Sequence, residues 1–417
     1  MRQDYLIFTG LLAPYESGKP APETMQKAAL QRLRQLSAHE IGHTLGLMHN
    51  YASSVNNRAS VMDYPHPSVS LNARGDLDFS TLYTNEIGEW DKRAILFGYQ
   101  DFVKGTDEND ALNKILAENT AKGLLFISDV DARAADGMHP VSHLWDNGKD
   151  AVEELTNVLK IRQIALSKFG EKNIQDNVPV ARLEDVLVPI FNYHRYQLEA
   201  VCKLIGGMDY SYAVKGDKQQ PPVKILPNDV QQKALNAALN CLDPSVLRLP
   251  ESILTLIPPR PPEYYSLGEL MPKRAGLGLD PLAAAEALVN FELAFLFNPK
   301  RANRLVQFEA RANTIGFDEV VNKIIAKTWG KPLLRGLEGE IGNQTRHMVV
   351  TWLLGLSQNE TANYQVKAIC FKALREIQIK CNASGGANSI YTIERIKHPK
   401  DIALPQHKEL PPGAQLG

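Results

Sequence analysis

Residues 39–49 contain histidines and a glutamate with the spacing of a metal site. On a helix, His39 and His43 lie one turn apart on the same face, so both imidazoles can reach one ion. Glu40 lies beside them and can hold a water molecule. A catalytic zinc ion takes three protein ligands and keeps one position for solvent. This segment therefore predicts a zinc-hydrolase site.

His49 is the third candidate ligand, and Gly46 explains how it reaches the metal. A straight extension of the helix would carry His49 off the face that bears the other two histidines, so the backbone must turn after Leu45. Glycine permits such a turn because it adopts positive φ without a Cβ clash. We expect His49 to swing back toward the metal after Gly46.

These residues resemble a known signature. The segment 39–49 is similar to the HExxHxxGxxH motif of the metzincin clan of zinc peptidases, and SVMDY at 60–64 resembles the clan's methionine-containing turn. The resemblance implies that Met62 forms a floor beneath the three histidines. It also implies that Tyr64 is an outer ligand at rest and a hydroxyl donor to the oxyanion in the transition state.

Other stretches extend the resemblance over nearly the whole chain. Together they look like the C-terminal portion of a bacterial group of large zinc-dependent metalloproteases, the Met-zincin domain family. The stretches are MRQDYLIFTGLLAPYE, RASVMDYPHP, TNEIGEWDKRAILFGY, FISDVDARAADGMHPVSHLWDNG, IPPRPPEYY, GLDPLAAAEAL and LPPGAQLG. The resemblance implies export to the periplasm, the cell surface or the medium. The first twenty residues lack the features of a signal peptide.

The segment before His39 is short for this clan. Metzincins place a twisted sheet before the active-site helix, and its edge strand binds extended substrate. Only 38 residues precede His39, too few for several strands and their connections. We therefore expect a fragment of a longer enzyme whose N-terminal sheet is largely missing.

The fold class expected is mainly α. Helical periodicity predicts an active-site helix over 22–47, with Ala28, Leu33, Leu36 and Ile41 on or near its buried stripe. A short buried strand is expected at 124–128 and a small hairpin around residues 210–226. Further helices are predicted over 85–97, 110–122, 149–169, 181–205 with a kink at Pro189, from about 228, and over 281–297, 300–313, 317–329, 337–356, 361–381 and 388–397.

Three domains are predicted. Residues 1–148 form a partial metzincin-like catalytic domain with the zinc motif and Met-turn, 149–260 a helical domain with a small hairpin, and 261–417 a C-terminal helical bundle. Proline and glycine are frequent in 258–281, which makes this stretch the best internal boundary.

The predicted activity is that of a zinc-dependent endopeptidase acting on peptide or protein substrates. Glu40 takes a proton from water and passes it to the leaving amine, while Zn²⁺ and Tyr64 stabilise the oxyanion. One alternative is a catalytically impaired helical scaffold or interaction module that retains the zinc motif. Another is a zinc amidohydrolase acting on non-protein amides.

Composition limits the partners. Lys and Arg number 46 against 47 Asp and Glu, giving a net charge of -1, so no global field favours nucleic acid. No run of 18 apolar residues is present, so no membrane span is expected. An exposed apolar face on the active-site helix would favour self-association. Cys202, Cys241, Cys370 and Cys381 are expected as buried thiols, with a disulfide possible in an oxidising compartment.

Overall fold

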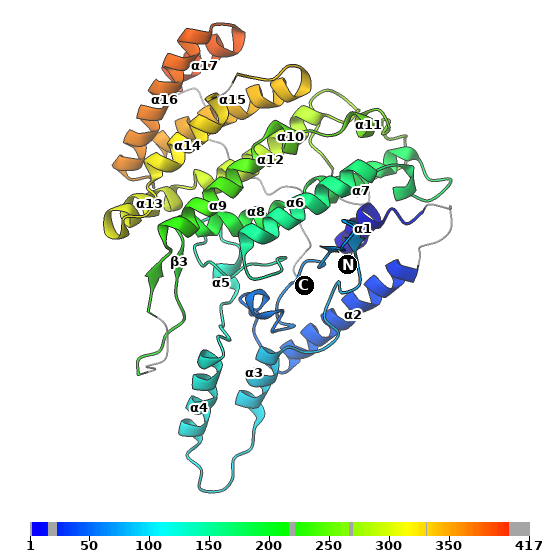
Figure 1. Cartoon of the computed structure of the whole chain (residues 1–417), viewed down its shortest axis with the longest axis vertical. Helices are drawn as coiled ribbons and strands as arrows, with labels where there is room; N and C mark the ends of the chain where they lie inside the picture. The colour runs from blue at the N-terminus through cyan, green and yellow to red at the C-terminus, as the bar shows by residue number, and fades with distance from the viewer. Residues whose placement is uncertain (1, 16–22, 217–221, 267–269, 331, 400–417) are drawn as a thin grey trace.

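The computed structural model describes residues 2–15, 23–216, 222–266, 270–330 and 332–399. Helices dominate these residues, and the strands form two small antiparallel hairpins (Figure 1). In the first hairpin β1 (Ser70–Leu71) pairs with β2 (Leu77–Asp78), and in the second β3 (Met208–Asp209) pairs with β4 (Lys224–Ile225). The mainly α fold and the hairpin near residues 210–226 are therefore confirmed.

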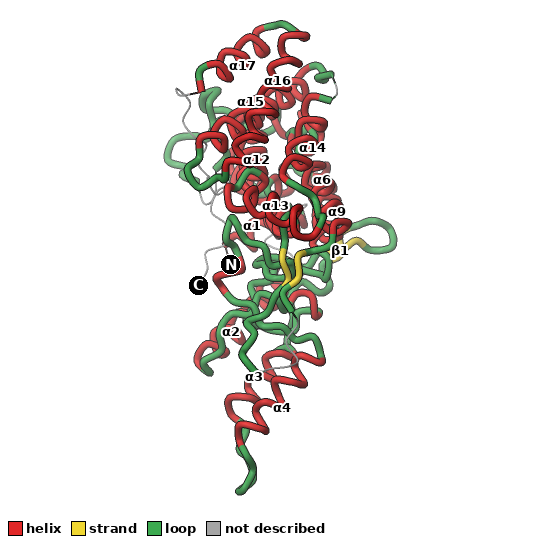
Figure 2. Tube along the Cα trace, turned by 90° about the vertical axis from the view of Figure 1, so that its left-hand side faces the viewer, coloured by secondary structure: helices red, strands yellow, loops and turns green. Residues whose placement is uncertain are grey.

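The N-terminal third carries the helix with His39 and His43, together with a projecting arm. Two helices, α3 and α4, extend side by side from one end of the molecule in both views (Figures 1 and 2). The helices of this third are α1 (Arg2–Leu12), α2 (Glu23–Thr44), α3 (Glu89–Tyr99), α4 (Glu108–Ala121) and the short α5 (Asp129–Ala132).

The middle of the chain forms a helical layer next to the N-terminal third. Helix α6 packs on α8, α8 packs on α9, and α7 contacts α1, so the layer joins the N-terminal third directly. Its helices are α6 (Ala151–Lys168), α7 (Leu183–Phe191), α8 (Arg195–Leu204), α9 (Asn228–Cys241), α10 (Pro244–Leu247) and α11 (Glu251–Leu254).

The C-terminal helices lie at the end of the molecule opposite the arm (Figure 2). Helix α12 contacts both α8 and α15, which connects the middle layer to the last helices. These helices are α12 (Pro281–Leu296), α13 (Pro299–Ala312), α14 (Phe317–Trp329), α15 (Gly336–Gln358), α16 (Tyr364–Ser384) and α17 (Ala387–Lys397).

Polar caps fix where several of these helices begin. The Asp150 carboxylate and the Asn298 amide oxygen each accept from two backbone N–H groups, at the start of α6 and α13, and the Asp280 carboxylate accepts from one, that of Ala283, at the start of α12. Both α12 and α13 then start with proline, whose fixed φ suits the first helical turn.

One apolar core runs through the molecule. A single cluster of buried side chains includes residues of α1, α6–α9 and α12–α16. The four cysteines are free and buried in this cluster, as expected from the sequence. The division into three domains stays a prediction.

Two elements differ from expectation. Residues 124–128 form no strand; instead they are an extended segment whose Ile127 carbonyl accepts from the Tyr51 backbone N–H at 2.8 Å. The helix expected over 181–205 breaks after Phe191, because the Phe191 carbonyl accepts from Arg162 Nε at 2.7 Å and the Arg195 N–H bonds Asn192 instead. No helix in the described part of the chain is long and apolar enough to cross a membrane.

Candidate metal centre

Helix α2 buries a polar stripe rather than the apolar one expected. Its buried residues follow helical spacing and are Met25, Ala28, Arg32, Gln35, His39 and Gly42. Arg32 forms an ion pair with Asp4 of α1, and Gln35 Nε2 donates to the Val61 carbonyl. Leu33 and Ile41 are exposed and Leu36 is half-buried, so the expected stripe was wrong except at Ala28. The polar partners of Arg32 and Gln35, on α1 and in residues 60–64, determine which face of α2 is buried.

The chain turns at Gly46 in the way the sequence predicts. Gly46 has φ of +80°, and its N–H donates to His43 O while the Leu47 N–H donates to Gly42 O. This pair of bonds is the Schellman ending of a helix. The turn releases the backbone from α2 and lets His49 approach the helix again.

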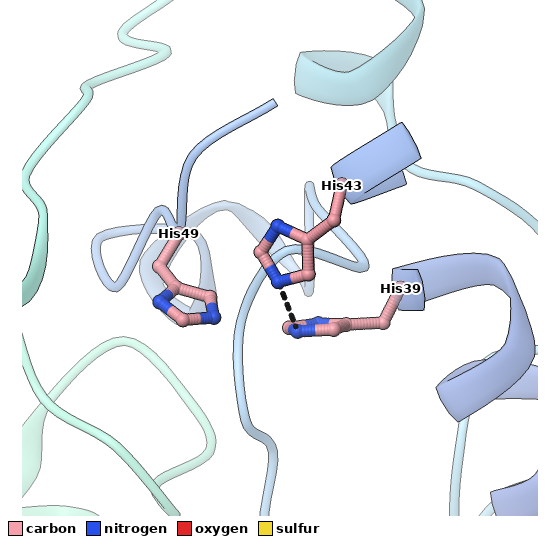
Figure 3. A group of neighbouring side chains, drawn as sticks. All are labelled: His39, His43 and His49. Carbon is pink, nitrogen blue, oxygen red and sulfur yellow. Dashed lines mark hydrogen bonds between the residues drawn. The ribbon is translucent and has the colours of Figure 1, made fainter. Parts of the chain in front are cut away.

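The structure brings the three histidines together (Figure 3). His39 and His43 extend from α2, and His49 faces them from the loop, with ring centroids 4.7–5.2 Å apart. One nitrogen of each imidazole lies within 4.8 Å of the others. Among the described residues this is the one group of three or more His, Cys, Asp or Glu close enough to share an ion.

The second nitrogen of each imidazole shows which atoms can bind metal. His39 Nδ1 lies 2.7 Å from Val61 O, His43 Nδ1 lies 3.0 Å from Leu47 O, and His49 Nδ1 lies 2.8 Å from the Asp129 carboxylate. Carbonyl and carboxylate oxygens only accept, so each Nδ1 carries the proton and each Nε2 of the neutral ring carries a lone pair.

Converging lone pairs fit a cation. His39 Nε2 and His43 Nε2 lie 3.1 Å apart, and His49 Nε2 is buried with no hydrogen-bond partner among the described residues. Three nitrogens without protons would repel one another unless a positive ion lay between them. Burial lowers the pKa of His39, and the neighbouring histidines lower it further, which keeps this ring neutral and able to bind metal. The residues therefore fit a zinc ion.

Residues 60–64, which resemble a methionine-containing turn, pack directly beneath α2. Met62 is fully buried, and a methyl group at Gly42 would collide with its sulfur. The turn itself is held by Asp91 of α3, which accepts from Ser60 Oγ at 2.6 Å and from the Val61 N–H at 2.8 Å. Both Gly42 and Asp91 are needed for this packing, and neither was singled out from the sequence.

Glu40 and Tyr64 occupy different positions around the histidines. Glu40 is exposed on α2, close enough to His39 for its charge to favour the protonated ring. Tyr64 is buried, with its ring centroid 4.7 Å from that of His39 and 5.1 Å from that of His49. A solvent-facing carboxylate and a buried phenol thus flank the site.

Asp129 is the main site residue that sequence reasoning missed. It lies 80 residues after His49 and accepts a hydrogen bond from His49 Nδ1–H, while Ser128 Oγ donates to its other oxygen at 2.9 Å. Burial alone would raise the pKa of Asp129, but the hydrogen bonds from His49 and Ser128 outweigh burial and lower it. A carboxylate on the outer nitrogen of a ligand histidine orients the ring and raises its basicity. No local spacing signals this partnership.

Comparison with known proteins agrees with this geometry. The model of a family described as Met-zincin matches residues 21–333. No curated protein matches the chain, and no solved structure does. The match includes the three histidines and residues 60–64 and supports a function of zinc-metalloprotease type. The chain belongs to the Met-zincin family.

Proposed function

We propose that this protein is a zinc-dependent endopeptidase that uses Glu40 as its general base. The observation that carries the proposal is the convergence of three unprotonated imidazole nitrogens, each fixed by an oxygen on the opposite side of its ring. Zinc, when bound to His39, His43 and His49, supplies Lewis-acid chemistry that lowers the pKa of a water molecule and polarises a carbonyl group.

The chain's own residues move the proton. The carboxylate of Glu40 accepts a proton from water as the water oxygen bonds to the carbonyl carbon of the peptide. The carbon–nitrogen bond then breaks, and Glu40 returns the proton to the amine nitrogen. No covalent bond to the protein is needed. The exposure of Glu40 on α2 supports this role, because water and substrate can reach its carboxylate.

Tyr64 is proposed to donate a hydrogen bond to the substrate carbonyl oxygen. The phenol lies among the rings of His39, His49 and Tyr51, with centroids within 6.2 Å. Negative charge develops on the carbonyl oxygen in the tetrahedral transition state, and a donor already in place stabilises that charge.

Self-association is also proposed, through the outer face of α2. Leu30, Leu33 and Ile41 are all more than 40% exposed along this helix, which leaves an apolar strip in water. Sizing with light scattering tests this proposal, and a strictly monomeric profile would count against it.

Glu40→Gln is the direct test of the catalytic assignment. The amide cannot take the proton of water, so peptide hydrolysis should fall by about 10²–10⁴-fold while zinc content stays unchanged. Glu23→Gln is a matched control, because Glu23 is exposed on the same helix. Cleavage that survived Glu40→Gln would show that the general base is another group. Loss of zinc in this variant would show that Glu40 has a structural part in the site.

A further inference from the structure

A second polar site lies away from the histidines, between the loop 140–149 and the helices α6 and α8. A pocket there is lined by the side chains of Ser142, Asp146, Glu154, Gln197 and Lys203, together with neighbouring residues of the same elements. Ser142, Gln197 and Lys203 are each at most 2% exposed, so the pocket reaches into the protein interior. We call this set of oxygens, from Ser142, Asp146, Glu154 and Gln197, the oxygen pocket.

Three oxygens of the pocket have no donor in the part of the chain that the structure describes. They are Ser142 Oγ, Asp146 Oδ1 and Gln197 Oε1. The amide of Gln197 cannot be reversed to change this, since its Nε2 donates to the Trp145 carbonyl at 2.8 Å. The other oxygen of Asp146 accepts from Ser54 Oγ. A buried acceptor without a partner costs free energy, and three in one pocket indicate an occupant that binds oxygen.

The lysine of the pocket does not meet this need. Lys203 Nζ already donates to the carbonyl oxygens of Asp131, Ala132 and Ser142. An ammonium group has three protons, so these three carbonyls use all of them. The other lining lysine, Lys149, is exposed.

Charge also favours a cation. Two carboxylates, those of Asp146 and Glu154, line this pocket together with one buried ammonium group, that of Lys203, while the second lining lysine, Lys149, is exposed. Burial raises the pKa of both carboxyl groups to about 7, and the charge of Asp146 adds to the burial that raises the pKa of the neighbouring Asp63. Arg58 adds a positive charge near Asp63 and Glu154. A bound cation would let both carboxylates of the pocket ionise at neutral pH.

We propose that the oxygen pocket is a binding site for a hard divalent cation, with Ca²⁺ as the best match. Carboxylate, amide and hydroxyl oxygens are the ligands that Ca²⁺ takes in proteins, in a flexible geometry that water completes. Mg²⁺ demands a stricter octahedron and keeps more of its waters, and zinc prefers nitrogen and sulfur. The site is separate from the histidine centre and does not depend on the proposed peptidase activity.

The position of the pocket suggests what a cation would do there. Its loop donates backbone hydrogen bonds to the segments that carry the histidine centre, from Trp145 N to Tyr64 O at 2.7 Å and from His143 N to Tyr51 O at 3.2 Å. A cation that joined Ser142 and Asp146 of this loop to Glu154 of α6 and Gln197 of α8 would hold the loop against the helices. It would thereby stabilise the wall beside Tyr64.

Terbium luminescence tests the site on the full chain with zinc present. Tb³⁺ replaces Ca²⁺ at oxygen sites, and its emission is sensitised by a nearby indole; Trp145 is the residue next to Asp146. We expect saturable emission on tryptophan excitation that Ca²⁺ displaces. Asp146→Asn and Glu154→Gln should each weaken terbium binding by about tenfold or more, because each removes one ligand charge. Glu153→Gln, an exposed neighbour on α6, should bind terbium like the parent protein.

A second measurement needs no substitution. Millimolar Ca²⁺ should raise the melting temperature of the zinc-loaded parent protein above its value without added Ca²⁺, since a ligand that binds only the folded state stabilises it. No rise with Ca²⁺, or terbium emission that is unchanged in both pocket variants, would overturn the proposal. A melting temperature that rises equally in the parent and in Glu154→Gln would do the same, because the cation would then bind elsewhere.

Discussion

The histidine centre takes its three candidate ligands from residues 39–49, whereas the oxygen pocket takes its oxygens from three segments between residues 142 and 197. The first arrangement follows from one helix and one turn, so it can be read from local spacing. The second exists only after a loop has packed on two helices. Residues outside the pocket reach the histidine centre, where Asp129 contacts His49 and the Trp145 N–H donates to the Tyr64 carbonyl. Local sequence thus specifies the ligands, and distant sequence positions them.

His43→Ala should distinguish the two sites most clearly, because it should affect zinc binding alone. Loss of one imidazole leaves two ligands, so zinc content of the purified protein should drop from near one equivalent to near zero. His43 is exposed at the end of α2, so the fold should survive, with a melting temperature close to that of the parent protein stripped of zinc. Elemental analysis measures the metal, and calcium-dependent stability should be kept. Full zinc occupancy in this variant would contradict the three-histidine centre.

Acidification should break the contact between the segment after the histidine centre and the helical layer at α8 before it unfolds either region alone. His66 lies two residues after the segment 60–64. Its ring packs on the rings of Tyr193 and Tyr196 at α8, whose centroids lie 4.9 Å and 6.0 Å from its own. Burial lowers the pKa of His66 from 6.5 to about 4. As the pH falls, the unfolded chain therefore takes up a proton at His66 before the folded protein does. The stabilisation that neutral His66 contributes is present above pH 6.5 and is lost as the pH falls toward 4.

The expected loss from His66 is on the order of 3 kcal/mol between these two pH values. Denaturant titrations at a series of pH values, in chelator, measure it. The glutamine of His66→Gln cannot take up a proton. The free energy of unfolding of this variant should therefore fall less steeply with decreasing pH. Other buried histidines contribute to the remainder, among them His143 and His194, whose pKa values burial also lowers. An unchanged slope in His66→Gln would show that His66 is protonated freely in the folded protein.

Asp129 tests how far the distant region positions the local ligands. Asp129→Ala removes the carboxylate from His49 Nδ1 and should weaken zinc binding by about 10–100-fold, as loss of such outer partners does at other zinc sites. Asp129→Asn keeps an acceptor without the charge and should lose less. Competition with a chromophoric chelator gives the affinities.

The control for Asp129 lies two residues along α5. The carboxylate of Asp131 accepts from the hydroxyls of Tyr210 and Tyr212 and makes no contact with a histidine of the centre in the described structure. Asp131→Asn should therefore keep the zinc affinity of the parent protein. Equal losses in Asp129→Asn and Asp131→Asn would mean that α5 acts only as a structural support.

These contacts show what the sequence could and could not predict. The helix, the turn at Gly46 and the gathering of His39, His43 and His49 depend on neighbours within eleven residues, and the structure has all of them. The buried face of α2 could not be predicted, because Asp4 and the Val61 carbonyl draw polar side chains inward. Asp129 could not be predicted either, since 80 residues separate it from His49.

The smallest expected effect concerns the turn that makes the local site possible. At φ of +80°, a side chain on residue 46 would suffer a clash within its own backbone, although no other atom lies within 4 Å of its Cβ position. Gly46→Ala should therefore cost about 1 kcal/mol in the free energy of unfolding, from backbone strain alone. Gly46→Asn should cost less, because asparagine tolerates this region of φ. Equal stability of the alanine variant and the parent protein would mean that the chain leaves α2 by another route. The position of His49 would then depend on Asp129 more than on the turn.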